Sequence, residues 1–275
     1  MEVNGQGAES AGLQATETDP SSSLSKLLCG PTSNGLGFSE IDQVLQHVSD
    51  SIDTILRELV WLNTVEPHRI ALFGPFLGRS LQELAALALL GRLDPVRVLL
   101  IQKVQAQSGY QISMPWKSSL RWQGDVLAEK AEKPVDLWSE KVNYDSIKKA
   151  LLGDYFDHLL WQPAVGRLLL QADGDPGNVW LAELRREDQR AFLSRRRNEF
   201  SHQYSSFSKG IHHEFVLPAG AQYDKSTIAH LIGQTVRTVA TLGLVSHFIP
   251  HSTHLLSAAE AFRLYEAVED LEVLS

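Results

Sequence analysis

Apolar residues recur every three or four positions through much of this chain, and this spacing constrains the fold more than any other feature. From Ser39 to about Thr64 they form the single stripe of an amphipathic helix. Ser39 followed by acidic residues is typical of a capped helix start, and Pro67 follows the predicted end. The stripe consists of Ile41, Val44, Leu45, Val48, Ile52, Ile55, Leu56 and Leu59.

Helical spacing also marks the stretches that follow. Residues Arg79–Leu93 are rich in Leu and Ala with almost no polar face, which indicates a helix buried on several sides. Asp94-Pro95 is typical of an N-cap with proline in the first turn, so a kink and a resumed helix are expected over Val96–Val104. Further helices are predicted over 144–171 with breaks at Gly153 and Pro163, over Trp180–Lys209, over Thr227–Phe248 between a Ser226 cap and Pro250, and over Ser257–Leu271. Together they predict an all-α helical bundle.

Two regions lack this spacing. Residues 1–37 are rich in Gly, Ser, Thr, Asn and Gln, with few apolar residues apart from Leu24, Leu27 and Leu28, which predicts a disordered N-terminal tail. The helical domain is then expected over 38–275. Within it, residues 107–143 contain several helix breakers and predict an irregular insertion, in which Tyr110–Met114 and Leu120–Val126 form a small β-hairpin.

Composition narrows the class of protein. The 275 residues include 43% hydrophobic residues, which suits a folded chain of one large or two small domains. The single cysteine, Cys29, excludes an intramolecular disulfide framework and any multi-cysteine metal site. The sequence has no apolar run long enough to span a membrane, and its start lacks the basic residues of a secretory signal. We therefore expect a soluble protein of the reducing cytoplasm without a membrane partner.

The charge is unevenly distributed. The net charge is −8, which argues against broad nucleic-acid binding. The segment Glu183–Arg197 contains six arginines and three acidic residues, a local balance of +3, so the rest of the chain carries −11. Such a cluster is either a solvated helix face with internal ion pairs or a local phosphate-binding ridge.

The residues that follow favour the phosphate-binding interpretation. On a helix, Arg197 lies about 40° from Leu193, within the apolar stripe, where a guanidinium is costly unless a partner satisfies it. Asn198 and His202 lie four residues apart and share another face. An always-charged cation and a titratable imidazole thus lie within about a turn and a half.

This segment resembles the HEPN superfamily, whose motif is an arginine followed after four to six residues by a histidine. Arg197 and His202 match the motif, and Asn198 fits the polar residue favoured after the arginine. Through Tyr204, the segment is similar to HEPN toxins paired with minimal nucleotidyltransferase antitoxins, in which the matching tyrosine is a modification target. The match covers eight residues. The longer separation of the Leu- and Ala-rich helix from the motif departs from the minimal HEPN bundle.

The resemblance implies a HEPN-like bundle and a metal-independent endoribonuclease without a cofactor. His202 would act as general base or acid, Arg197 would neutralise phosphate oxygens, and Asn198 would orient either group. Arg195, Arg196 and Tyr204 would contact RNA or its phosphates. Because the directions of Arg197 and His202 differ by about 140° on one helix, two helices of a homodimer would form a composite site. An antitoxin or other regulatory protein, or a trigger such as phage infection, would control it.

Other interpretations remain open for the same residues. Arg197 could bridge to a buried acid such as Asp53 or Glu83, His202 could be an ordinary surface histidine, and Tyr204 could belong to the core. His247, His251 and His254 could ligate zinc, although Pro250 interrupts a helical arrangement and no adjacent acid completes a hydrolase motif. The bundle could also be a non-catalytic HEPN-like interaction or nucleotide-binding module.

Overall fold

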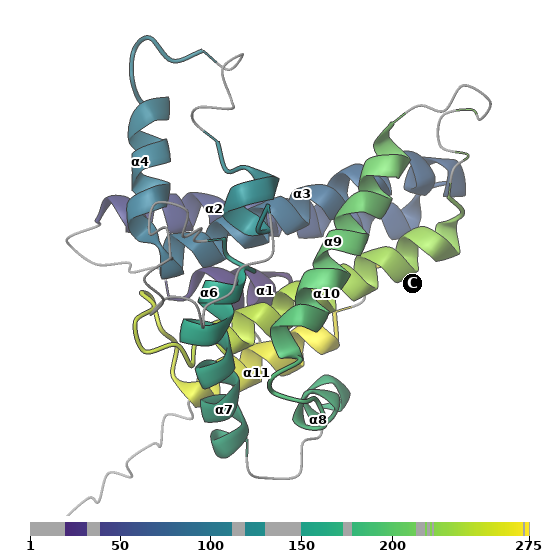
Figure 1. Ribbon diagram of the computed structural model, residues 1–275. Coiled ribbons are helices and arrows are strands. Elements are labelled where there is room, and N and C mark those ends of the chain that lie inside the picture. Colours follow the sequence, from purple (N-terminus) through teal and green to yellow (C-terminus); the bar gives the residue numbers. More distant parts are fainter. Residues whose placement is uncertain are drawn as a thin grey trace, which may run out of the picture.

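The computed structural model describes residues 20–31, 39–111, 119–129, 150–172, 178–212, 218, 221, 223–271 and 273–274. Within these residues the fold is all-α, without a strand, as predicted. The elements are α1 (Pro20–Cys29), α2 (Glu40–Trp61), η1 (Leu62–Thr64), α3 (Pro67–Leu93), α4 (Pro95–Gln105), η2 (Trp122–Val126), α6 (Asp154–Phe156), η5 (Asp157–Trp161), α7 (Gln162–Gln171), α8 (Val179–Arg185), α9 (Phe192–Ile211), α10 (Lys225–Ser246) and α11 (Ala258–Glu269). Figure 1 shows α9 and α10 crossing the long helix α3, with α4 projecting from the bundle.

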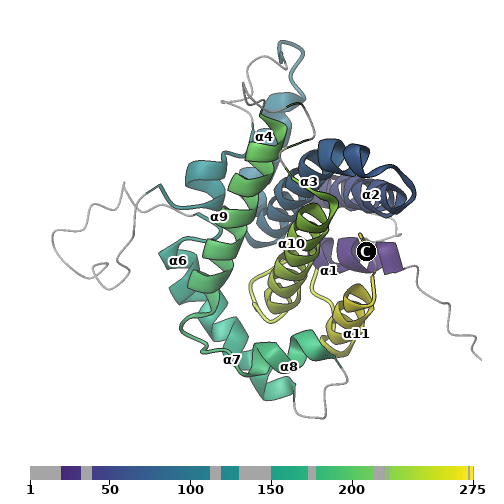
Figure 2. The same cartoon turned by 90° about the vertical axis from the view of Figure 1, so that its right-hand side faces the viewer.

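Helix α10 forms the centre of the core. Figure 2 shows it surrounded by α1, α3, α9 and α11, and it contacts each of them. Among the described residues, α10 is the one helix long and apolar enough to cross a membrane, but 72% of its apolar window is buried inside the bundle. It is therefore a core helix by its packing. Asp224 caps its first turn by accepting from the Thr227 N–H at 2.7 Å, in the place predicted for Ser226.

Helix α1 corrects the prediction that all of residues 1–37 form a disordered tail. Leu24, Leu27 and Leu28 are fully buried, and α1 packs against α2, α10 and α11. Gly30 ends the helix with a φ of +78°, where an added Cβ would lie 1.9 Å from the His254 carbonyl oxygen. The sequence signal was weak because the helical spacing of Leu24, Leu27 and Leu28 spans little more than one turn, and the stabilising contacts come from distant segments.

Helix α2 confirms its prediction, including the cap. The Asp42 N–H donates to the Ser39 hydroxyl at 3.3 Å and the Ser39 N–H donates to the Asp42 carboxylate at 2.7 Å, which is a capping box. Asp94 similarly caps α4, with the Arg97 N–H donating to its side chain at 3.4 Å. Ser257 caps α11 through the Glu260 N–H at 3.2 Å.

Helix α3 begins twelve residues before the predicted start at Arg79, and Pro75 lies inside it. Gly74, Pro75 and Gly78 are helix breakers in isolation, but here they allow neighbouring helices to approach closely. A Cβ on Gly74 would lie 2.4 Å from Ile228 of α10, and one on Gly78 would lie 2.4 Å from the Phe207 ring of α9. Tertiary packing therefore overrides the local preference in this half of α3.

The segment around η2 is irregular but forms no β-hairpin. The Leu127 N–H donates to the Trp122 carbonyl at 2.9 Å, and Gly124 between them has a φ of +105°. Residues 119–129 therefore form a tight turn rather than a strand. The N–H groups of Leu151 and Leu152 donate to the Asp125 and Val126 carbonyls at 2.8 and 2.9 Å, which fixes this turn to the bundle. The predicted partner strand Tyr110–Met114 falls largely outside the described residues.

Candidate active site

The predicted site lies on α9, which is shorter than the single helix expected over Trp180–Lys209. The helix is interrupted between α8 and α9. In this connection the Asp188 carboxylate accepts a hydrogen bond from the Arg190 N–H at 3.0 Å. This side-chain bond offers the backbone an alternative to the helical ladder. The following Ala191 N–H donates to the Asp188 carbonyl at 3.0 Å, and α9 then begins at Phe192.

Buried polar contacts fix α9 against its neighbours. The Gln82 side chain of α3 donates to the Gln203 carbonyl oxygen at 3.0 Å and to the Phe200 backbone carbonyl at 3.3 Å. The Gln203 amide in turn donates to Thr238 of α10 at 3.1 Å. Because buried polar groups are costly without partners, this chain of bonds sets the register of three helices. No sequence pattern indicates this chain of bonds, since glutamines at helix positions are usually exposed.

Arg196, predicted to bind RNA, is almost completely buried. Its guanidinium pairs with Glu187 and, at 3.1 Å, with Glu199, and it lies over the Phe192 ring. A guanidinium enclosed by two carboxylates cannot reach an external phosphate. Its neighbour Arg195 is half-exposed and pairs with the same Glu187 at 2.8 Å. The arginine cluster is thus partly an internal ion-pair network, as the solvated-face interpretation supposed.

Arg197 faces α6 rather than open solvent. Its Nη2 lies 2.7 Å from Oδ1 of Asp154, and both side chains are 26% exposed. The guanidinium thus bridges to an acid, but to neither of the two considered from the sequence: Glu83 pairs with Arg79. The Arg197 Nε is buried and has no hydrogen-bond partner among the described residues. The guanidinium therefore keeps donors that its carboxylate partner does not use.

Asn198 and His202 lie together on the solvent-exposed face of α9. Neither forms a hydrogen bond with another described residue, and both are exposed. The spacing of four residues places them on one side of the helix, as predicted. The same exposed face carries Ser194, Arg195, Ser205 and Lys209.

Tyr204 lies between two other side chains. Its ring stacks on Trp122 with centroids 3.6 Å apart, and the Arg79 guanidinium carbon lies 4.5 Å from the ring centre. Arg79 Nη2 also donates to the Tyr204 hydroxyl oxygen at 2.6 Å. Burial, above all, raises the pKa of the Tyr204 hydroxyl. Both ring faces are covered, so this tyrosine packs between α3 and the η2 turn, and the hydroxyl expected to contact RNA or its phosphates accepts from Arg79 instead.

The three C-terminal histidines point to different partners. His247 is buried, with Nε2 2.8 Å from the Leu27 carbonyl and Nδ1 2.9 Å from Arg92 Nη2. His254 Nε2 lies 2.5 Å from the Asp42 carboxylate, and His251 is exposed. No group of three His, Cys, Asp or Glu in the described part of the chain is placed to hold a metal ion. The zinc arrangement considered from the sequence is therefore not formed by these residues.

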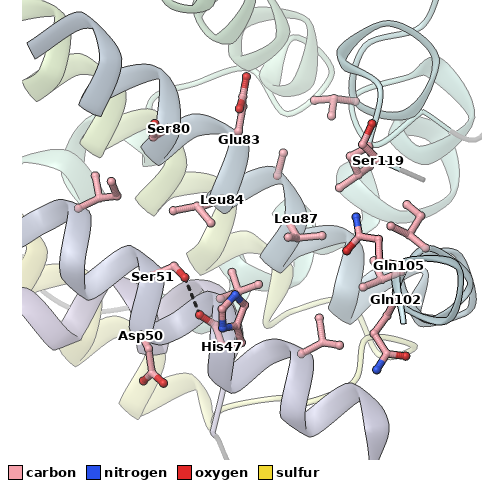
Figure 3. A pocket seen from close by; sticks show the side chains of 18 of the residues that line it. His47, Asp50, Ser51, Ser80, Glu83, Leu84, Leu87, Gln102, Gln105 and Ser119 are labelled. Carbon is pink, nitrogen blue, oxygen red and sulfur yellow. Dashed lines mark hydrogen bonds between the residues drawn. The ribbon is translucent and has the colours of Figure 1, made fainter. Parts of the chain in front are cut away.

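A groove of about 1160 Å³ lies between α2, α3 and α4, with residues of the η2 turn and Tyr204 also lining it. Figure 3 shows His47 and Ser51 of α2, Leu84 and Leu87 of α3 and Gln102 of α4 around this space. Its lining combines apolar and polar side chains, as small-molecule and peptide sites do. The sequence did not reveal it, because its residues come from separate helices.

Comparison with known proteins adds no relative: no family model, no curated protein and no solved structure matches this chain.

Proposed function

We propose that the protein is a metal-independent endoribonuclease of HEPN type, acting through Arg197, Asn198 and His202 of α9. The observation that carries the proposal is the exposed, unpaired Asn198–His202 pair next to a partly exposed arginine. An exposed imidazole and a cation in one site are the minimum needed to move a proton and stabilise a phosphate.

The reaction needs a proton acceptor, a proton donor and a cation. One imidazole removes the proton from the ribose 2′-hydroxyl, whose oxygen attacks the adjacent phosphorus while the bond to the 5′-oxygen breaks. The leaving 5′-oxygen takes a proton from a protonated imidazole or from water. Arg197 donates hydrogen bonds to the non-bridging oxygens, where negative charge develops, and Asn198 orients the phosphate or the imidazole.

A homodimer would bring Arg197 and His202 together, which one α9 helix cannot do. Arg197 faces α6, whereas His202 lies on the exposed face, so the two side chains of one protomer diverge. Two α9 helices related by a two-fold axis would place Arg197 of one protomer near His202 of the other. We place this dimer in the cytoplasm, with RNA as substrate and an antitoxin or other regulatory protein limiting its activity.

The test is cleavage of several unstructured RNAs by purified protein in the presence of a chelator. Wild type is expected to cleave, and His202→Ala to lose at least about 100-fold in rate, as is usual for general acid–base residues. Ser205→Ala, one turn further on the same exposed face, is the matched control and should cleave like wild type. Equal cleavage by His202→Ala and wild type would reject the site.

A second candidate function is a non-catalytic binding module, which the groove between α2, α3 and α4 favours. It has the size and mixed lining of a ligand site. Trp122 and Tyr204, which stack on each other, both line it. If wild type leaves all RNAs intact, and if Leu87→Glu in the groove abolishes capture of a cellular ligand, this alternative is supported.

A further inference from the structure

The strongest unexplained feature near α9 is the carboxylate that holds Arg197. Asp154 is the first residue of α6, and Gly153 separates it from the buried residues Leu151 and Leu152. The N–H groups of those two leucines donate to the η2 turn, and Trp161 Nε1 donates to the Leu151 carbonyl at 2.9 Å. The backbone that presents Asp154 is thus fixed on both sides. The long arginine side chain is the more adaptable partner of the pair.

A second carboxyl group lies next to the same guanidinium. Asp157 is one turn beyond Asp154, and its Oδ1 is buried without a hydrogen-bond partner among the described residues. Burial is the main cause that raises the pKa of Asp157, while the nearby Arg197 charge opposes the rise. In the free protein, Arg197 therefore faces acidic side chains. Their negative charge would repel an RNA phosphate that approaches the guanidinium.

We infer that Asp154 is a built-in competitor for the RNA phosphate, so that RNA must take the Arg197 guanidinium from this carboxylate. The inference rests on the proposed function, because it concerns access to the same arginine. Nη2 is occupied by Asp154 at 2.7 Å, and both donor pairs with which a guanidinium binds a phosphate in bidentate fashion, Nε with Nη2 and Nη1 with Nη2, include this atom. In its effect on RNA, Asp154 acts through Arg197 and is a positioning residue that lowers RNA affinity in the free protein.

The test is binding of a fluorescein-labelled, single-stranded 2′-O-methyl RNA, which cannot be cleaved through its 2′-oxygen. Asp154→Asn keeps the shape of the side chain and is expected to bind this RNA with a Kd about tenfold lower than that of wild type. A factor of this size is typical of one additional charge-assisted hydrogen bond. Its binding should also depend more steeply on salt, by a slope of about −0.7 for one additional phosphate contact to a single strand. Asp154→Glu retains the charge and should restore wild-type binding.

Two further variants separate this effect from general changes in charge or folding. Asp154→Asn combined with Arg197→Ala should lose the entire gain, since the inference assigns the effect of this carboxylate on RNA binding to the Arg197 guanidinium. Glu58→Gln removes the same charge from the exposed surface of α2 and should leave affinity unchanged. Circular dichroism and urea unfolding of each variant report whether it is folded.

The outcomes distinguish the inference from the proposed ribonuclease. A gain in binding that requires Arg197 supports the inference even if no RNA is cleaved, and in that case only the catalytic proposal fails. Equal or undetectable binding by wild type and Asp154→Asn overturns the inference, even if wild type cleaves RNA. A gain that persists without Arg197 overturns it as well.

Discussion

Nδ1 of His247 lies 2.9 Å from Nη2 of the fully buried Arg92. The Leu256 N–H also donates to this Nδ1, at 3.1 Å, so the proton of the neutral ring is on Nε2, where it donates to the Leu27 carbonyl. Arg92 Nη1 donates to the Leu28 carbonyl at 3.2 Å and to Ser246 at 2.7 Å. This pair therefore fixes the carboxyl end of α1 to α3 and α10, and it explains why α1 is folded.

The first prediction concerns pH. Burial and the Arg92 charge lower the pKa of His247 to about 3, so the folded protein keeps the ring neutral while the unfolded chain binds a proton below about pH 6.5. The unfolded state thus gains protons as the pH falls, and this residue should reduce the free energy of unfolding by about 2 kcal/mol between pH 7 and pH 5.

Urea unfolding at several pH values measures this loss. His247→Gln should show a smaller decrease between pH 7 and pH 5 than wild type, whatever its absolute stability. His47→Gln, at an exposed position of α2, is the control and should follow wild type. A decrease in His247→Gln as large as in wild type would contradict the neutral, Arg92-bound histidine.

The second prediction concerns the close approach of α3 and α9. Gly78→Ala places a Cβ 2.4 Å from the Phe207 ring, a clash that the ring must move to relieve, so the free energy of unfolding should fall by about 1–3 kcal/mol. Gly233→Ala is the control, because no atom lies within 4 Å of its added Cβ in α10 and helix propensity should raise stability by about 0.5–1 kcal/mol. Equal effects of the two substitutions would show that α9 does not pack on Gly78.

The third prediction concerns Tyr204. Tyr204→Phe loses the hydrogen bond with Arg79 but keeps the stack on Trp122, so the free energy of unfolding should fall by about 1 kcal/mol. RNA cleavage, measured in the same preparation, should stay within about twofold of wild type, because a packing role needs no hydroxyl. A loss of cleavage above about tenfold would instead indicate that the hydroxyl contacts the substrate.

The sequence predicted the elements whose signals are local. The apolar stripe and capping box of α2, the Asp94 cap before Pro95 and the Ser257 cap of α11 all depend on residues within one or two turns. The long α10 was also expected, although Asp224 rather than Ser226 caps it.

Features that depend on distant partners were not predictable from the local pattern. Helix α1 is held in place by Arg92 and His247, which bind its last carbonyls. Gly74 and Gly78 lie inside α3 because side chains of neighbouring helices, Ile228 and Phe207, occupy the space that a Cβ would fill.

The candidate site shows the same division between local and distant signals. The shared exposed face of Asn198 and His202 follows from helix geometry. Which arginine would be buried could not be derived from spacing. The apolar stripe predicts that Arg197 is enclosed, yet Arg196 is the buried arginine. Glu187, which precedes α9, and Glu199, one turn after Arg196, both pair with its guanidinium. The Asp154 partner of Arg197 lies 43 residues away in the chain, beyond any local pattern.

The composite dimer site is tested most directly by mixing two inactive variants, Arg197→Ala and His202→Ala. After unfolding and joint refolding in equal amounts, half of the dimers contain one subunit of each kind, and each such dimer has one site with both residues intact. Cleavage of unstructured RNA should then recover to about one quarter of the wild-type rate. Active wild type with no recovery in the mixture would contradict a site shared between two α9 helices, and inactive wild type would contradict the ribonuclease itself.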